Sequence, residues 1–276
     1  MQLSFEFFPP KTDEQRAQLE RTARKLKPRD PAYVSVTFGA GGSTLAYTSE
    51  TVRGLAHDHG FCAAPHISCM GGTREEIREL LNTYRALGCT HLVALRGDMP
   101  SGMARIGELR YASDLVTFIR AEHGDTFHIE VGCYPECHPQ ADDAHADLRA
   151  FKTKIDAGAD GAITQYFYNA DGYFRFVDEA RRMGIATPIV PGIMPITSST
   201  QLMRFSDACG AEIPRWIRLR LQGFGDDTAS IKAFGLDVVT ELCARLAGGG
   251  APAIHFYTMN QSVATLAVLQ RLGWEG

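Results

Sequence analysis

The sequence lacks the features that would direct the protein to nucleic acid or to a membrane. Its 276 residues contain no basic cluster, and 28 lysines and arginines against 32 aspartates and glutamates give a net charge of -4. No apolar run approaches the length of a membrane-spanning helix, and the amino terminus has no basic region followed by an apolar one. We therefore expect a cytoplasmic protein with neither nucleic-acid nor membrane partners.

The sequence is also poor in motifs that hold metals, disulfides or nucleotides. Its seven cysteines are scattered, and their odd number is typical of reduced thiols in the cytosol. Cys133 and Cys137 have no further cysteine nearby, so we expect no metal site. The loop 39–42 is rich in glycine but lacks the lysine of a P-loop, and no G-x-G-x-x-G follows a strand. Any nucleotide cofactor would therefore be held by the body of the fold.

What the sequence does contain is a repeated unit of a short apolar strand and a following helix. Residues 91–98 begin with an apolar run and end in Arg96, Gly97 and Asp98, the pattern of a strand buried on both faces with a charged carboxyl end. The other expected strands are 4–8, 33–37, 62–67, 127–132, 161–167, 188–193 and 253–257. Eight alternating units predict an α/β fold, a single-domain (β/α)8 TIM barrel over residues 1–276, rather than an open doubly wound sheet.

Helix signals support this reading along most of the chain. Thr12 and Thr73 each begin a sequence typical of a capping box at the start of a helix. The least regular part lies between the last two strands. There the pattern indicates a helix around 202–205, a loop or short helix over 213–225, and another helix around 238–242.

Polar side chains fall at the carboxyl ends of most of these strands, where barrel enzymes carry their chemistry. The candidates are Glu6, Thr37, His66, Arg96 with Asp98, Tyr134 with His138, Gln165, and Tyr257 with Asn260. Each one alone also has a structural explanation: Glu6 could be ion-paired to Arg96 inside the barrel, and His66 could be a hydrogen-bonded core histidine. Composition and spacing thus predict an enzyme with one polar barrel mouth, and they do not name its reaction.

Nine short motifs, in order along the chain, closely resemble those of the bacterial methylenetetrahydrofolate reductases. They are SFEFFPP (4–10), SVTFGA (35–40), APH (64–66), ALRGD (94–98), YASDL (111–115), YPECHP (134–139), ITQ (163–165), PGIMP (191–195) and HFYTMN (255–260). Because these motifs extend from residue 4 to residue 260, the resemblance covers nearly the whole chain.

The resemblance implies a flavoprotein oxidoreductase of one-carbon metabolism. FAD would bind without covalent attachment at the barrel mouth, take electrons from NADH or NADPH and pass them to 5,10-methylenetetrahydrofolate in ping-pong order. The product, 5-methyltetrahydrofolate, would feed methionine biosynthesis. Glu6 matches the family's catalytic acid, which protonates the folate and opens its five-membered ring. Asp98 matches a second catalytic residue beside flavin and pterin, whose charge favours the cationic iminium.

The resemblance also implies which residues bind the cofactor and the substrate. The positions that hold FAD are Thr37, His66, Leu95, Arg96, Gly97, Asp98, Ala112, Tyr134, His138, Asp147, Ala150 and Lys154. The substrate-binding positions are Asp98, Gln165, Gln201, Phe205, Tyr257 and Gln261. Arg96 and Lys154 are the natural partners of the diphosphate. Taken without the resemblance, Asp147 and Lys154 would be assigned to the solvated face of a helix.

Two positions depart from the family pattern. Gln261 stands where an arginine is common, which leaves the affinity for the folate tail open, and Met259 replaces a usual leucine. The chain ends soon after the barrel, so we expect no regulatory domain, and the resemblance implies a homo-oligomer. The choice between NADH and NADPH stays open. So do two alternatives: a folate-binding barrel that transfers a methyl group without redox chemistry, and a reductase fed by a partner electron carrier.

Overall fold

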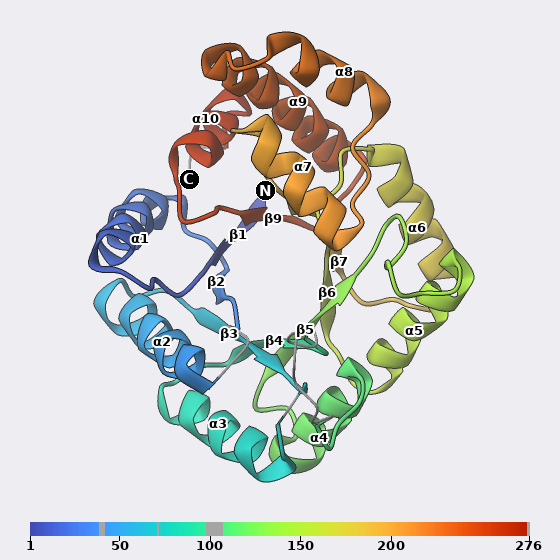
Figure 1. The fold of residues 1–276 in the computed structure, drawn as a ribbon. Helices are drawn as coiled ribbons and strands as arrows, with labels where there is room; N and C mark the ends of the chain where they lie inside the picture. Colours follow the sequence, from blue (N-terminus) through green and yellow to red (C-terminus); the bar gives the residue numbers. More distant parts are fainter. Residues whose placement is uncertain (39–41, 71, 98–106, 275–276) are drawn as a thin grey trace.

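The strands form a ring at the centre of the molecule and the helices surround it (Figure 1). The computed structural model describes residues 1–38, 42–70, 72–97 and 107–274, with the backbone alone for 42–45. Asp98, a predicted site residue, lies outside the described residues, as does most of the glycine-rich loop 39–42.

All strand pairs are parallel, in the order β7-β6-β5-β4-β3-β2-β1-β9-β8. The strands are β1 (Gln2–Phe7), β2 (Tyr33–Val36), β3 (Ala63–Ser68), β4 (His91–Leu95), β5 (His128–Cys133), β6 (Gly161–Thr164), β7 (Ile189–Val190), β8 (Gly192–Ile193) and β9 (Ala253–Tyr257). Only Pro191 separates β7 from β8, and its ring nitrogen has no proton to donate to a ladder. The predicted seventh strand is therefore present as two halves, which close the ring.

A helix follows almost every strand. The α-helices are α1 (Asp13–Leu26), α2 (Gly42–Arg53), α3 (Arg74–Ala86), α4 (Ala112–His123), α5 (Ala144–Asp156), α6 (Ala170–Arg182), α7 (Ser199–Cys209), α8 (Arg215–Phe224), α9 (Thr228–Gly248) and α10 (Val263–Arg271). Two single turns, η1 (Lys27–Arg29) and η2 (Gly54–Asp58), extend α1 and α2. Three helices, α7 to α9, lie between β8 and β9 along the chain and form one side of the ring (Figure 1).

The predicted (β/α)8 barrel is confirmed. The ambiguous segment 213–225 contains a helix, α8, and the predicted strand 161–167 is shorter, since β6 ends at Thr164. Thr12 accepts a hydrogen bond from the Gln15 backbone, and Thr73 forms a complete capping box with Glu76. No helix within the described ranges is both long and apolar enough to span a bilayer.

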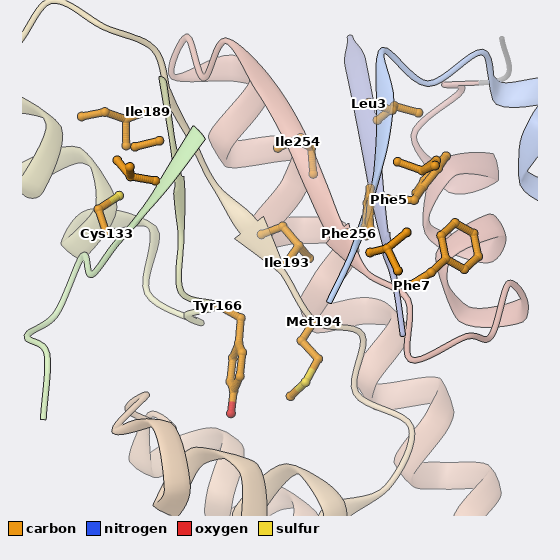
Figure 2. Packing of buried hydrophobic residues seen from close by; sticks show 14 of the residues in the cluster. Leu3, Phe5, Phe7, Cys133, Tyr166, Ile189, Ile193, Met194, Ile254 and Phe256 are labelled. Atoms are coloured by element: carbon orange, nitrogen blue, oxygen red, sulfur yellow. The ribbon is translucent and has the colours of Figure 1, made fainter. Parts of the chain in front are cut away.

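The alternation of side chains along β1 divides the hydrophobic core from the polar barrel interior. Leu3, Phe5 and Phe7 are all buried and lie on one face of the strand, close to Ile254 and Phe256 of β9 (Figure 2). The residues between them, Ser4 and Glu6, consequently point to the opposite face, because strand side chains alternate. The sequence of β1 thus places an acid inside the ring while its apolar residues hold the helices against the outside.

Candidate functional site

Glu6 lies inside the barrel between two histidines, one from the adjacent strand β9 and one from β3, which is two strands away on the other side. Its carboxylate Oε2 is 3.4 Å from His66 Nε2 of β3 and 3.9 Å from His255 Nε2 of β9. The Glu6 side chain is 14% exposed, whereas His255 is fully buried. The structural alternative for Glu6, an ion pair with Arg96, is not what the structure shows. An acid in contact with two imidazoles and a little solvent is suited to donating and regaining a proton.

The two histidines differ in their surroundings. Burial lowers the pKa of His66, while the nearby charge of Glu6 acts in the opposite direction. His255 Nδ1 is 2.7 Å from the hydroxyl of Ser4, which fixes the orientation of the ring. Ser4 and His255 therefore form a hydrogen-bonded pair on the adjacent strands β1 and β9, and Glu6 lies 3.9 Å from the other nitrogen of the same ring.

A pocket of about 440 Å³ lies between α4 and α5, beside the carboxyl ends of β4 and β5. It brings together six predicted cofactor residues: Arg96, Ala112, His138, Asp147, Ala150 and Lys154. Its small residues, Ala112 and Ala150, leave room between the two helices. The sequence-based grouping of these positions is therefore reproduced in space.

Charged groups in this pocket are held by specific hydrogen bonds. Lys154 Nζ donates to the carbonyl oxygen of Gly132 at 2.5 Å, and Arg96 Nη2 donates to Gln140 Oε1 at 2.5 Å. The carboxylate of Asp147 accepts the backbone N–H of His138 at 2.8 Å and so anchors the loop after β5 to α5. Asp147 and Lys154 thus line a pocket. Without the family resemblance, the sequence pattern had assigned them to the solvated face of a helix.

Lys154 shows that this pocket fits an anionic ligand. Desolvation lowers the pKa of its ammonium group, and the positive charge of Arg96 adds to this effect, while Asp147 opposes it. Arg96 and Lys154 are the two cations of the lining, and its two carboxylates are the exposed Asp142 and Asp147, which accepts the backbone N–H of His138. A diphosphate bound here would pair with the two cations, so the residues present fit a diphosphate group.

Gly97 follows Arg96 in a backbone conformation that only glycine adopts readily. Its φ is +84°, and a Cβ at this position would lie 2.0 Å from the hydroxyl oxygen of Ser68. That hydroxyl donates to the Arg96 carbonyl at 2.8 Å. The chain can therefore turn sharply at the end of β4 only with glycine here, and this turn positions Arg96.

A second, larger pocket of about 990 Å³ lies on the other flank of the barrel mouth, beside α1 and α10. It contains three residues singled out from the sequence, Thr37, Asn260 and Gln261, with Lys11 and Tyr47 also in its wall. Asn260 holds this flank together, because its side chain accepts from Phe8 N at 3.0 Å and donates to Phe8 O at 2.8 Å. The lining is mostly neutral, in contrast to the pocket between α4 and α5.

The remaining predicted residues lie at strand ends or on α7, and neither pocket includes them among its described lining residues. Leu95 ends β4, and Tyr134 follows β5 with its ring 4.6 Å from that of His138. Tyr257, at the end of β9, donates from its hydroxyl to Thr164 O at 2.7 Å. Gln165 follows β6, while Gln201 and Phe205 belong to α7.

Sequence reasoning missed three residues with clear contacts at the site: Gln140, Ser4 and His255. Gln140 was invisible because only folding brings its loop against Arg96. Ser4 and His255 could have been found from the sequence. Ser4 is two residues before Glu6 on β1 and His255 is two residues before Tyr257 on β9, so each shares a strand face with a predicted site residue. Among the described residues, no group of three or more His, Cys, Asp or Glu side chains is arranged to hold a metal ion.

A parallel barrel with an interior acid and a charged pocket at the carboxyl ends of its strands has the architecture of the (β/α)8 barrel enzymes. Within that class, the family model of methylenetetrahydrofolate reductase matches residues 1–273. The chain belongs to the methylenetetrahydrofolate reductase family. The recognition made from the nine motifs is therefore confirmed.

Individual relatives agree with this assignment. A 5,10-methylenetetrahydrofolate reductase of Salmonella typhimurium is 38% identical over 271 residues, covering 98% of this chain and 90% of the relative. Methylenetetrahydrofolate reductase (NADH) 1 of Arabidopsis thaliana is 36% identical over 98% of this chain but only 48% of its own length. A Clostridium thermocellum protein described as binding two copies of 5-methyl-5,6,7,8-tetrahydrofolic acid shares the fold, with a TM-score of 0.66 at 17% identity over 98% of this chain and 93% of that one.

Proposed function

We propose that this protein reduces 5,10-methylenetetrahydrofolate to 5-methyltetrahydrofolate, with NADH or NADPH as electron donor and non-covalent FAD as cofactor, in the cytoplasm and in support of methionine biosynthesis. The observation that carries the proposal is the pairing of an interior acid, Glu6, with a pocket at the same end of the barrel that contains two cations, Arg96 and Lys154. Membership of the family supports the reaction, and the NADH named for plant relatives supports the electron donor.

The cofactor would be held mainly from the α4–α5 side. The chemistry that FAD supplies when bound is hydride transfer, from the nicotinamide nucleotide in one half-reaction and to the folate in the other. Arg96 and Lys154 would bind its diphosphate as fixed positive charges, and Asp147 would keep the loop at His138 in place. The other proposed cofactor contacts are Thr37, His66, Leu95, Gly97, Asp98, Ala112, Tyr134 and Ala150.

Glu6 would act as the general acid on the folate. A carboxyl group enclosed by the barrel and flanked by two imidazoles can give a proton to a ring nitrogen, which opens the five-membered ring for hydride attack. Asp98 would stabilise the resulting cation. Gln165, Gln201, Phe205, Tyr257 and Gln261, with Asp98, are the proposed folate contacts. The chain would act as one catalytic domain and assemble as a homo-oligomer.

The visible spectrum of the purified protein tests the cofactor and the electron donor together. We expect a yellow protein whose flavin bleaches anaerobically with NADH or NADPH and recovers with 5,10-methylenetetrahydrofolate. A colourless protein that cannot be reconstituted with FAD would contradict the proposal and favour non-redox methyl transfer. If the flavin is bleached only by a partner electron carrier, that carrier and not a nicotinamide nucleotide is the electron donor.

Substitution of the acid tests its role separately. Glu6→Gln should keep the flavin and its reduction by NADH, but slow the folate half-reaction by about 100- to 10,000-fold, the usual contribution of a general acid. Stopped-flow measurement of each half-reaction checks this. Glu50→Gln, which removes a surface carboxylate paired with Arg16, is the matched control and should change neither rate. Equal loss of both half-reactions in Glu6→Gln would show that Glu6 is structural.

A further inference from the structure

The interior of this barrel is unusually polar. Barrel interiors are normally filled by layers of branched apolar side chains. Here Ser4, Ser35, Glu130 and His255 are all at most 5% exposed and come from four different strands. Burying polar groups in this way costs free energy unless they are hydrogen-bonded, so the set calls for an explanation.

Five polar atoms of this interior are buried without a hydrogen-bond partner in the described part of the chain. They are Tyr33 Oη, Ser35 Oγ, His66 Nε2, Glu130 Oε2 and His255 Nε2. Leaving such groups without a partner costs free energy, and they are normally served by buried water. The space for Glu130 is built in, because a Cβ on Gly161 of the neighbouring strand would lie 2.6 Å from Glu130 Oε2. The sequence of the neighbouring strand therefore accommodates the buried carboxylate of Glu130.

The polar groups continue from Glu6 toward the amino end of the barrel. Glu6 is 3.9 Å from His255 Nε2, and the His255 ring stacks on Tyr33 of β2 with 6.1 Å between centroids. Burial is the main reason why the pKa of Tyr33 is raised, and the negative charges of Glu130 and Glu6 raise it further. The side chain of Ser4 acts in the opposite direction. The unpartnered Tyr33 hydroxyl is therefore within electrostatic reach of both interior carboxylates, Glu130 and Glu6.

The same sequence of contacts reaches solvent at the amino end. Tyr33 stacks on His91 at 5.5 Å, and the His91 ring is 4.9 Å from that of His128, its register partner on β5. His128 Nε2 is 3.2 Å from Glu130 Oε1, and its side chain is 40% exposed. His128 is thus the point where the interior groups meet water.

Other titratable groups border this end of the barrel. His128 Nδ1 is 4.0 Å from Asp160, which is held by Arg120 at 2.5 Å, and Cys62 Sγ lies 3.4 Å from His91 Nδ1. The hydrogen bond between His128 and the Glu130 carboxylate raises the pKa of His128, whereas burial lowers the pKa of His91. His128 is accordingly the better proton acceptor of the two at neutral pH.

We propose that these residues form a proton route through the barrel axis, from solvent at His128 through Glu130 and Tyr33 to His255 and Glu6. The inference rests on the proposed function. Reduction of the folate by a hydride also consumes one proton, which Glu6 gives up as it becomes a carboxylate. One proton from water must therefore return to Glu6 in each turnover. With cofactor and folate bound at the carboxyl end, the opposite end of the barrel remains the open side.

Two conservative substitutions test the route. Glu130→Gln keeps the shape of the side chain but cannot carry a proton, and Tyr33→Phe keeps the ring stacking but removes the hydroxyl. We expect both to slow proton uptake in the folate half-reaction by about tenfold, a fraction of a full general-acid effect. A pH-indicator dye in stopped flow measures the uptake. The bleaching of flavin by NADH should be unchanged, since that hydride transfer takes up no proton through Glu6.

Glu122→Gln is the matched control, because it neutralises a glutamate on the surface of α4 that pairs with Arg78. A third variant, His128→Ala, removes the entrance, and added imidazole should restore its rate. Tyr33→Phe and His128→Ala decide the matter on their own if Glu130→Gln does not fold. Unchanged proton uptake in these variants, or a loss that imidazole does not restore, would overturn the route. A parent protein without NADH-reducible flavin would instead contradict the proposed function.

Discussion

The two flanks of the barrel mouth differ in charge although they lie at the same end of the same sheet. The α4–α5 flank carries four charged side chains, Arg96, Asp142, Asp147 and Lys154, in a pocket of about 440 Å³. The α1–α10 flank is larger, about 990 Å³, and Lys11 is the charged residue among its described lining residues. Separation of charge in this way lets one mouth bind an anionic group on one side and leave the other side for a largely neutral ligand.

The flanks also differ in what holds them together. On the α4–α5 flank, side chains donate to carbonyl oxygens and amides and leave cationic charge directed into the pocket. On the α1–α10 flank, the side chain of Asn260 joins the loop after β9 to the end of β1 through both polar groups of Phe8. Substitutions should therefore affect ligand affinity on the first flank and folding stability on the second.

The largest effect is expected on the charged flank. Lys154→Met keeps most of the apolar stem and removes the charge, and FAD affinity should fall by about 100- to 1,000-fold, as for a charged partner lost from a partly buried site. Fluorescence titration of apo protein with FAD measures this. Lys152→Met, two residues away on α5 and paired with Asp156, is the control and should leave affinity unchanged. If Lys154→Met kept the FAD affinity of the parent protein, the α4–α5 flank would not be the side that binds the anionic group.

The same substitution has a consequence for stability against pH. Because desolvation lowers the pKa of Lys154 in the folded apo protein, the unfolded chain binds the proton more tightly. This residue therefore makes apo-protein stability rise with pH between its lowered pKa and the ordinary value of 10.5, and its contribution is lost as pH falls through the lowered value. Denaturant melts over the alkaline range should show a shallower rise in Lys154→Met than in the parent.

A smaller effect, on stability alone, is expected at Asn260. Asn260→Ala should lower the free energy of unfolding by about 2–4 kcal/mol, since two buried hydrogen bonds are lost and alanine is strained at the φ of +52° found here. Asn260→Gly is the matched variant, because it tolerates that φ and so isolates the hydrogen-bond loss. Urea denaturation provides both values. If the glycine variant were as stable as the parent, Phe8 would not be the connection that holds this flank.

The smallest effect is expected at Gln261. Gln261→Arg adds a charge to the neutral flank and should lower KM for the folate by about two- to fivefold through an exposed ion pair, with kcat unchanged. The comparison of mono- and polyglutamated folate measures it, with Gln261→Met as the uncharged control. A larger change in kcat than in KM would mean that this flank contacts the reacting atoms and not the tail of the substrate.

Much of the fold could be predicted from the sequence because strand and helix patterns are local. The alternation in β1, the capping residues Thr12 and Thr73, and the apolar run of β4 each depend on a few adjacent residues. The division of the seventh strand at Pro191 was less evident, since a proline within a strand fixes no particular outcome by itself. α8 was ambiguous because Ile217, Leu219 and Leu221 alternate with polar residues and so do not mark one helical face.

The site was predicted less completely, for reasons of distance along the chain. The cofactor positions came from the family resemblance, since Asp147 and Lys154 by themselves have the pattern of a solvated helix face. The contact between Arg96 and Gln140 spans 44 residues, and that between Ser4 and His255 spans 251. Such pairs are fixed by barrel closure, which no local pattern encodes.

Barrel closure in turn depends on its weakest join. Two strands of two residues each, β7 and β8, provide the last pairs of the ring, and Pro191 contributes no donor between them. The barrel should therefore open locally at β7 and β8 before any other strand pair separates. Hydrogen exchange of the backbone amides of Gly192 and His255 should be the fastest among the barrel strands. Since His255 is also the neighbour of Glu6, transient opening there would admit water directly to the acid.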